Sequence, residues 1–220
     1  MTRSRHGECS LGDAAHRLIG KVCRPKDPEK TRQALLEAAH EEIHRQGYQA
    51  ASLSAILKRA GVTKGALYHH FPNKKALGLA MIDELIAGRI MTEFLKPLLD
   101  GEDVLARLKT AFMEEIPQNT QMAELGCPLN NLSQEMSPID EDFRIALDKQ
   151  FSRLREGIAE ALRRGQTLGK VHKEIDPWGS AVFIIASYEG CLGMAKSAQD
   201  MALFETCAAG LFRYLDTLKA

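Results

Sequence analysis

Four residues of types that can read DNA lie close together in the first third of the chain: Lys64, Gly65, Tyr68 and His69. Residues three and four apart share one face of a helix, so a helix beginning at Lys64 would turn these four outward together. A lysine can reach guanine edges or phosphates, and a glycine lets the backbone approach closely. The pattern predicts a short helix that enters the major groove of DNA.

Two short helices joined by a glycine turn would position this face. Ser52 can cap the first helix, Gly61 can make the turn, and Thr63 can cap the second helix. Leu67 and Phe71 are four residues apart and are expected to face inward. This is the order of elements in a helix-turn-helix unit, in which the second helix reads the bases.

The run GVTKGALYHHFPNKKAL, residues 61–77, resembles the DNA-binding signature of the TetR family of bacterial transcriptional repressors. The resemblance is strong over about residues 26–85 and weaker toward the C-terminus. It implies an all-α homodimer in which an N-terminal three-helix domain binds a palindromic operator in double-stranded DNA. It further implies a helix-turn-helix domain at residues 26–75 and an effector-binding and dimerisation domain at residues 76–220. The mixed charge and weak periodicity of the residues before them predict a flexible arm at residues 1–25.

The same resemblance indicates which residues contact DNA. They are Ser52, Ser54, Thr63, Lys64, Gly65, Tyr68, His69 and Lys74. The Tyr68 hydroxyl is expected on a phosphate, whereas Ser52 and Thr63 could also be helix caps only. Lys74 and Lys75 follow a cap at Asn73 and oppose the helix dipole there, which makes sense if a DNA phosphate lies nearby.

Charge is divided unevenly along a chain whose net charge is zero. Residues 24–80 carry ten basic and five acidic side chains, whereas residues 81–220 carry 15 basic and 22 acidic ones. A basic head on an acidic body is typical of a DNA-binding domain joined to a domain that does not bind DNA.

Composition also bounds where the protein works. No apolar run approaches the roughly 20 residues that a membrane helix needs, and the N-terminus has no long apolar segment typical of a signal peptide. Five cysteines without regular spacing fit a reducing cytoplasm better than a disulfide framework. We therefore expect a cytoplasmic protein without membrane contact, cofactor or metal.

Apolar residues at three- and four-residue steps predict helices through the rest of the chain, with no strand signal. The helix that links the two domains is expected to reach about Leu95, because Pro97 and Gly101 follow. Pro117 is expected to close the next helix, and Gly165 the long helix later in the chain. Residues 118–125 are polar and predict a loop.

The last two helices carry small residues over wide faces, and small residues let helices approach closely. These residues are Ala181, Ala186, Gly190, Gly193, Ala208, Ala209 and Gly210. Two such helices from each of two subunits would form a four-helix dimer interface. An intramolecular core would give the same pattern, so the homodimer rests on the family resemblance.

The effector is expected to be a small hydrophobic or electrophilic molecule. Aromatic side chains at Phe112, Trp178 and Tyr188 could line an apolar pocket, with Asn130 as a polar anchor.

Cys127 offers a second route to effector sensing, because the run from Gly126 to Ser133 resembles a TetR subgroup. Some members of that subgroup sense electrophiles or oxidants through the matching cysteine, and Lys196 matches the lysine that stands near it. A cation and a helix start would lower the pKa of the Cys127 thiol. The other interpretation is a small buried cysteine without a redox role.

The sequence also offers features of three other classes of protein. His40, Glu41 and His44 match the H-E-x-x-H motif of zincin metalloproteases, but no third ligand follows at a suitable spacing, and a solvated polar face explains the motif. A cysteine hydrolase using Cys127 lacks a paired base motif. A helical DNA-binding protein without effector control would not need the wide apolar core of the acidic body. The sequence favours a one-component transcriptional repressor and not an enzyme.

Overall fold

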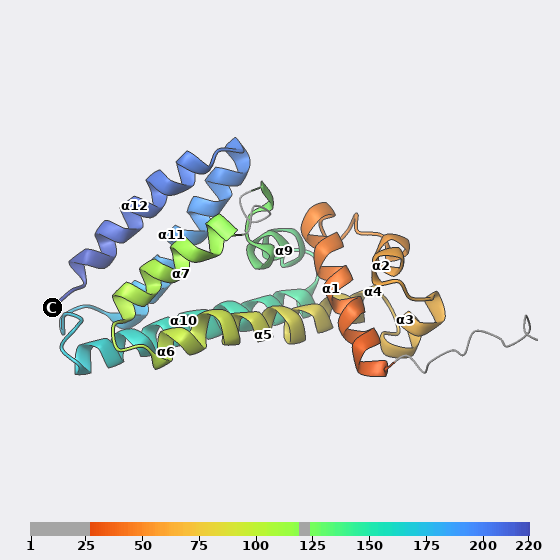
Figure 1. Cartoon of the computed structure of the whole chain (residues 1–220), viewed down its shortest axis with the longest axis horizontal. Coiled ribbons are helices and arrows are strands. Elements are labelled where there is room, and N and C mark those ends of the chain that lie inside the picture. The colour runs from red at the N-terminus through yellow and green to blue at the C-terminus, as the bar shows by residue number, and fades with distance from the viewer. Residues whose placement is uncertain (1–26, 119–123) are drawn as a thin grey trace, which may run out of the picture.

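The computed structural model describes residues 27–118 and 124–220, and this part of the chain is built of helices, with no strand (Figure 1). The elements are α1 (Pro28–Gln46), α2 (Leu53–Ala60), α3 (Lys64–His70), α4 (Lys74–Ala80), η1 (Met81–Ile86), α5 (Ala87–Arg89), η2 (Ile90–Leu95), α6 (Lys96–Asp100), α7 (Val104–Gln118), α9 (Pro128–Met136), α10 (Glu141–Thr167), α11 (Pro177–Ala198) and α12 (Met201–Thr217). An isolated bridge pairs Val171 with Lys219. The all-α fold class is confirmed, while the arm expected at residues 1–25 lies outside the described residues.

The helices α1 to α4 form a head at one end of the molecule, and α11 and α12 lie at the other end (Figure 1). The expected caps are present: Asp27 caps α1, and the hydroxyls of Ser52 and Thr63 accept backbone N–H bonds at the starts of α2 and α3. Gly61 ends α2 in the left-handed region at φ 63°. Local sequence therefore sets the helix-turn-helix geometry.

A long helical rod runs from Lys74 to Asp100 and connects the head to the body alongside α10 (Figure 1). It includes two π-helical segments, η1 and η2. The prediction that Pro97 helps to end this helix is wrong, because Lys96 before it keeps helical angles (φ −60°, ψ −50°) and the helix ends at Gly101. The π-helical segment just before Pro97 changes the hydrogen-bonding register, so the rod accommodates a residue without an N–H.

Two other expected helix ends also differ in the structure. Pro117 lies within α7, which reaches Gln118, and α10 continues through Gly165 to Thr167. Gly165 is buried, and a Cβ there would lie 2.6 Å from a methyl group of Val171. This glycine therefore serves close packing and not helix termination. The loop expected at residues 118–125 falls mostly on residues 119–123, which the structure does not describe.

One hydrophobic core spans the head and part of the body. Leu35, Ile56 and Leu67 of the head belong to the same buried cluster as Leu132 of α9 and Phe143 of α10. Two further clusters fill the body between α7, α10, α11 and α12. The head is thus packed onto α9 and α10 through shared apolar surface.

A disulfide joins Cys191 of α11 to Cys207 of α12, with their Cα atoms 5.5 Å apart. The expectation that the cysteines are not paired is therefore wrong for these two. The residues come from consecutive antiparallel helices, and their meeting depends on how those helices pack, which cysteine spacing does not reveal. Cys127 is the free cysteine within the described residues.

Candidate nucleic-acid interface and effector region

The helix α3 presents the four predicted base-reading residues to solvent. Lys64, Gly65, Tyr68 and His69 are exposed, whereas Leu67 on the opposite face is only 1% exposed. The Lys64 ammonium lies 5.8 Å from the centre of the Tyr68 ring, so cation and phenol form one surface feature. The structure thus brings these residues together on the outer face of the head.

Glycine at position 65 is not required by packing within the chain. A Cβ placed there would have the Thr63 hydroxyl as its nearest neighbour, at 3.9 Å. The small residue therefore leaves room for something outside the chain, which matches the close approach expected of a major-groove helix.

The residues expected on the DNA backbone lie at the starts of these helices. Ser52 Oγ accepts from Ala55 N at 3.3 Å and lies 2.5 Å from the hydroxyl of exposed Ser54. Thr63 Oγ1 accepts from Ala66 N, also at 3.3 Å. Ser52 and Thr63 therefore do act as caps, and DNA contacts by these hydroxyls stay a prediction.

The two lysines at the start of α4 have different surroundings. Lys74 donates to the Gln49 carbonyl at 3.2 Å and lies over the Tyr48 ring, so it stays on the head surface. Lys75 instead forms ion pairs of 2.8 Å with Asp140 and Asp142 at the start of α10. These carboxylates raise the pKa of Lys75 and offset its unfavourable interaction with the helix dipole. The sequence had suggested a DNA phosphate for this role.

Polar contacts also tie the head to the body. His44 of α1 donates from Nε2 to the Gly126 carbonyl at 2.8 Å, because a carbonyl can only accept. Glu135 of α9 accepts from the backbone N–H groups of Tyr48 and Gln49 at 2.7 and 2.8 Å. The turn that follows α1 is therefore held by a carboxylate from the body.

Comparison with known proteins decides the family. The model of bacterial regulatory proteins of the tetR family matches residues 35–81, and that of the tetracyclin repressor-like C-terminal domain matches residues 104–211. The chain belongs to the TetR family. It is a TetR-type transcriptional regulator with a helix-turn-helix DNA-binding domain.

Relatives within the family match over most of the chain. An uncharacterised HTH-type regulator of Lactococcus lactis is 34% identical over 80% of this chain and 88% of its own length. The transcriptional regulator AcuR of Cereibacter sphaeroides is 32% identical over 77% and 78%. The crystal structure of the reduced form of Escherichia coli NemR has a TM-score of 0.74 at 27% identity and covers 86% of this chain and 97% of that one. The fold of both domains is thus that of TetR-family regulators.

The residues of the H-E-x-x-H motif lie on α1 of this TetR-family regulator. His40 and His44 do share one helical face, with ring centres 5.8 Å apart, but the expected solvated face is wrong because His40 is only 8% exposed. Burial, then the charge of Arg89, then His44 lower the pKa of His40 from 6.5 to about 4, so it is neutral at pH 7. Among the described residues no group of three His, Cys, Asp or Glu side chains could hold a metal ion.

Two of the three aromatic residues predicted for the effector pocket lie together in the structure, and the third lies apart from them. Phe112 and Tyr188 stack with ring centres 4.6 Å apart, and Phe112 is buried. Trp178 lies at the start of α11 and is 44% exposed. Asn130 and Lys196 instead line a cavity of about 900 Å³ between α1, α9 and the end of α11.

That cavity was not predicted as a unit by the sequence. Its walls are His40, Ile43, His44, Arg45, Gln46, Gly47, Met81, Ile86, Glu124, Leu125, Pro128, Asn130, Asn131, Leu132, Gln134, Glu135, Gly193, Lys196, Ser197 and Gln199. The sequence signal that could have indicated this cavity is the pair of histidines in the H-E-x-x-H motif. Polar side chains on the inner face of a helix need partners, and a cavity beside them is one place to look for these partners.

Cys127 caps the start of α9, as expected, but the predicted lowering of its pKa is wrong. Burial of the thiol and the neighbouring Glu189 raise the pKa of Cys127 well above its usual range, outweighing the backbone N–H groups of Leu129 and Asn130. Lys196 bonds the Asn131 side-chain oxygen at 3.0 Å instead. At neutral pH the thiol is therefore protonated, which makes it a slow nucleophile.

Proposed function

We propose that this TetR-family regulator is a cytoplasmic homodimeric repressor that binds a palindromic operator and leaves it when an effector binds. The observation that carries the proposal is the exposed cluster of Lys64, Gly65, Tyr68 and His69 on α3. The helix-turn-helix contacts would be completed by Ser52, Ser54, Thr63 and Lys74. No helix among the described residues is long and apolar enough to cross a membrane.

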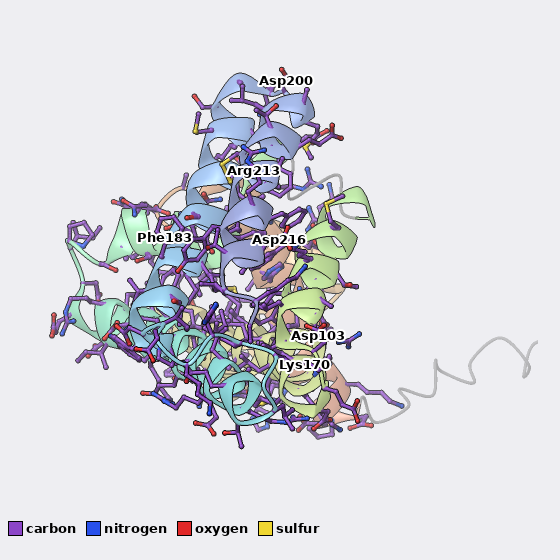
Figure 2. All side chains as sticks on the ribbon, turned by 90° about the vertical axis from the view of Figure 1, so that its left-hand side faces the viewer. Asp103, Lys170, Phe183, Asp200, Arg213 and Asp216 are labelled. Atoms are coloured by element: carbon purple, nitrogen blue, oxygen red, sulfur yellow. A yellow bond between two sulfur atoms is a disulfide. The ribbon has the colours of Figure 1, made fainter. Side chains whose placement is uncertain are left out.

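The dimer is supported by exposed apolar side chains on α11. Val182, Phe183 and Met194 are 40%, 49% and 54% exposed, although large apolar side chains are usually buried. A Cβ added at Gly190 or Gly193 would meet nothing within 4 Å in the same chain. Figure 2, seen from this end of the molecule, shows Phe183 on α11 beside α12. A second copy packed here would give each operator half-site its own α3.

Effector control is supported by the contacts between body and head. The candidate residues retained from the sequence are Cys127, Lys196, Phe112, Asn130, Trp178 and Tyr188. Of these, Asn130 and Lys196 share the cavity against α1, so a molecule there would touch the DNA-binding domain directly.

Selection from random duplex DNA followed by titration tests the function. We expect a palindromic consensus and an affinity that falls steeply with salt, because several phosphates are engaged. Lys64→Ala should weaken binding at least tenfold, while Lys173→Ala, which removes an exposed body lysine between α10 and α11, should not. Selection without any consensus would favour a DNA-binding protein without operator control, and equal binding by both variants would exclude this docking.

A further inference from the structure

The cavity between α1, α9 and the end of α11 is crossed by a hydrogen-bond network that connects head and body. His44 of α1 donates to the Gly126 carbonyl, the Asn131 amide donates to the Leu125 carbonyl at 2.6 Å, and Lys196 donates to Asn131. Gly126 has φ +78°, and a Cβ there would lie 3.1 Å from Lys196 Cδ. Whatever occupies the cavity therefore acts on groups that hold α1.

Four charged side chains line the cavity, namely those of Arg45, Glu124, Glu135 and Lys196. Glu124 is exposed, so solvent screens its charge. Within the described residues, Lys196 forms no ion pair, and its bond to Asn131 is to a neutral amide. The Glu135 carboxylate is occupied by two backbone N–H groups. Arg45 pairs with Glu41. A half-buried ammonium group facing a cavity is favourable for a negatively charged ligand.

A second group in the wall lacks a partner. The Nδ1 atom of His40 is buried and has no hydrogen-bond partner in the described structure. His40 as a whole is 8% exposed, so water does not readily satisfy it. An atom that water cannot reach is closed to a ligand in the cavity as well, so His40 contributes only its ring surface to the wall.

The remaining walls are apolar. Ile43, Met81, Ile86 and Leu132 are all less than 9% exposed and line the same cavity. They offer a surface for hydrocarbon, which an inorganic ion would leave unused. Polar groups that converge on one side of an apolar cavity favour an amphipathic organic ligand.

We propose that this cavity binds a small organic carboxylate, with the carboxylate at Lys196 and the apolar body against Ile43 and Leu132. The inference rests on the proposed function, since it supplies the effector class of the repressor. A carboxylate at Lys196 draws the ammonium group toward its own charge and away from the neutral Asn131 amide. This displacement of the ammonium group loosens the Asn131 and Gly126 contacts that position His44, and the head shifts relative to its operator-bound arrangement.

The test uses the full chain without DNA and compares hexanoate and benzoate with hexanamide and benzamide in thermal unfolding. The carboxylates should raise Tm in a concentration-dependent manner, and the neutral amides and inorganic phosphate should raise it less. Lys196→Gln should weaken carboxylate binding about tenfold or more, because a charge-assisted bond is lost. Lys196→Arg keeps the charge and should bind within a few-fold of wild type. Lys170→Gln, at an exposed residue that does not line the cavity (labelled in Figure 2), should bind as wild type does.

Operator release by the same compounds is measured separately. Operator binding without any response to carboxylates would overturn the ligand class and leave the repressor function intact. Carboxylate binding without operator binding would overturn the repressor function instead. Equal stabilisation by carboxylates and amides, equal stabilisation by phosphate, or equal loss in Lys196→Gln and Lys170→Gln would each overturn the site proposed here.

Discussion

Gly78 lies where the head meets the body, and replacing it with alanine tests that contact. A Cβ at Gly78 would lie 2.9 Å from both Phe143 Cζ and Tyr48 Cε2. The two rings already pack with centres 4.5 Å apart, so neither can move away without disturbing the shared core. Overpacking of this kind costs about 1–3 kcal/mol, while alanine gains up to about 1 kcal/mol of helix propensity over glycine. Gly78→Ala should therefore be destabilised by roughly 0–3 kcal/mol.

Gly88 provides the matched control in the same helical rod. A Cβ there would meet nothing within 4 Å, so Gly88→Ala should gain the propensity term alone, up to about 1 kcal/mol. The two variants should differ by about 1–3 kcal/mol, or roughly 2–12 °C in Tm for a chain of this size. Denaturant and thermal unfolding at equal protein concentration measure the difference. Equal stability of the two variants would refute the packing of Tyr48 and Phe143 around Gly78.

Four further outcomes are expected. His40 has a pKa of about 4 in the folded protein, below its ordinary 6.5, so its contribution to stability is present above pH 6.5 and lost as pH falls to 4. This loss amounts to about 3 kcal/mol of unfolding free energy, and His40→Gln should remove it from unfolding curves measured across that pH range. Glu135→Gln should lower the free energy of unfolding by about 1–2 kcal/mol and weaken operator binding, because two charge-assisted hydrogen bonds to the turn after α1 are lost. Unchanged operator affinity would show that this turn does not influence DNA binding. Tyr68→Phe should weaken operator binding about tenfold with little change in the slope of log affinity against log salt, because a neutral hydroxyl displaces no counterion; unchanged affinity would remove the phenol from the interface. Cys127 should react slowly with N-ethylmaleimide at pH 7, so wild type and Cys127→Ser should both stay bound to operator during a short treatment with the reagent. Rapid release of operator from wild type alone would restore the cysteine sensor.

The head could be predicted closely from sequence because its decisive signals are local. A hydroxyl at Ser52 or Thr63 bonds an N–H three residues away, and Gly61 adopts its left-handed angle within its own turn. The outward face of α3 follows from helical spacing alone. These features depend on residues adjacent in sequence, so no knowledge of the rest of the fold is needed.

The body could be predicted less well because its decisive contacts are distant in sequence. Lys75 has carboxylate partners more than sixty residues later in the chain, and the sequence suggested DNA phosphate nearby. Gly165 reads as a helix stop, yet it is a packing site against Val171. The Cys127 thiol depends on Glu189, which only the placement of α11 brings near. Tertiary contacts overrode the local signal in each case.

The core shared by head and body limits how the protein can be divided. Leu132 and Phe143 complete the packing of α1 to α4, although both lie far beyond the helix-turn-helix in sequence. A fragment that ends with the head would expose the apolar surface that these residues cover. Chimeras that exchange DNA specificity between family members should therefore carry α9 and the first turns of α10 with the head, or repack their faces to match. A chimera joined at the sequence boundary between head and body would combine two halves of cores that did not evolve to pack together.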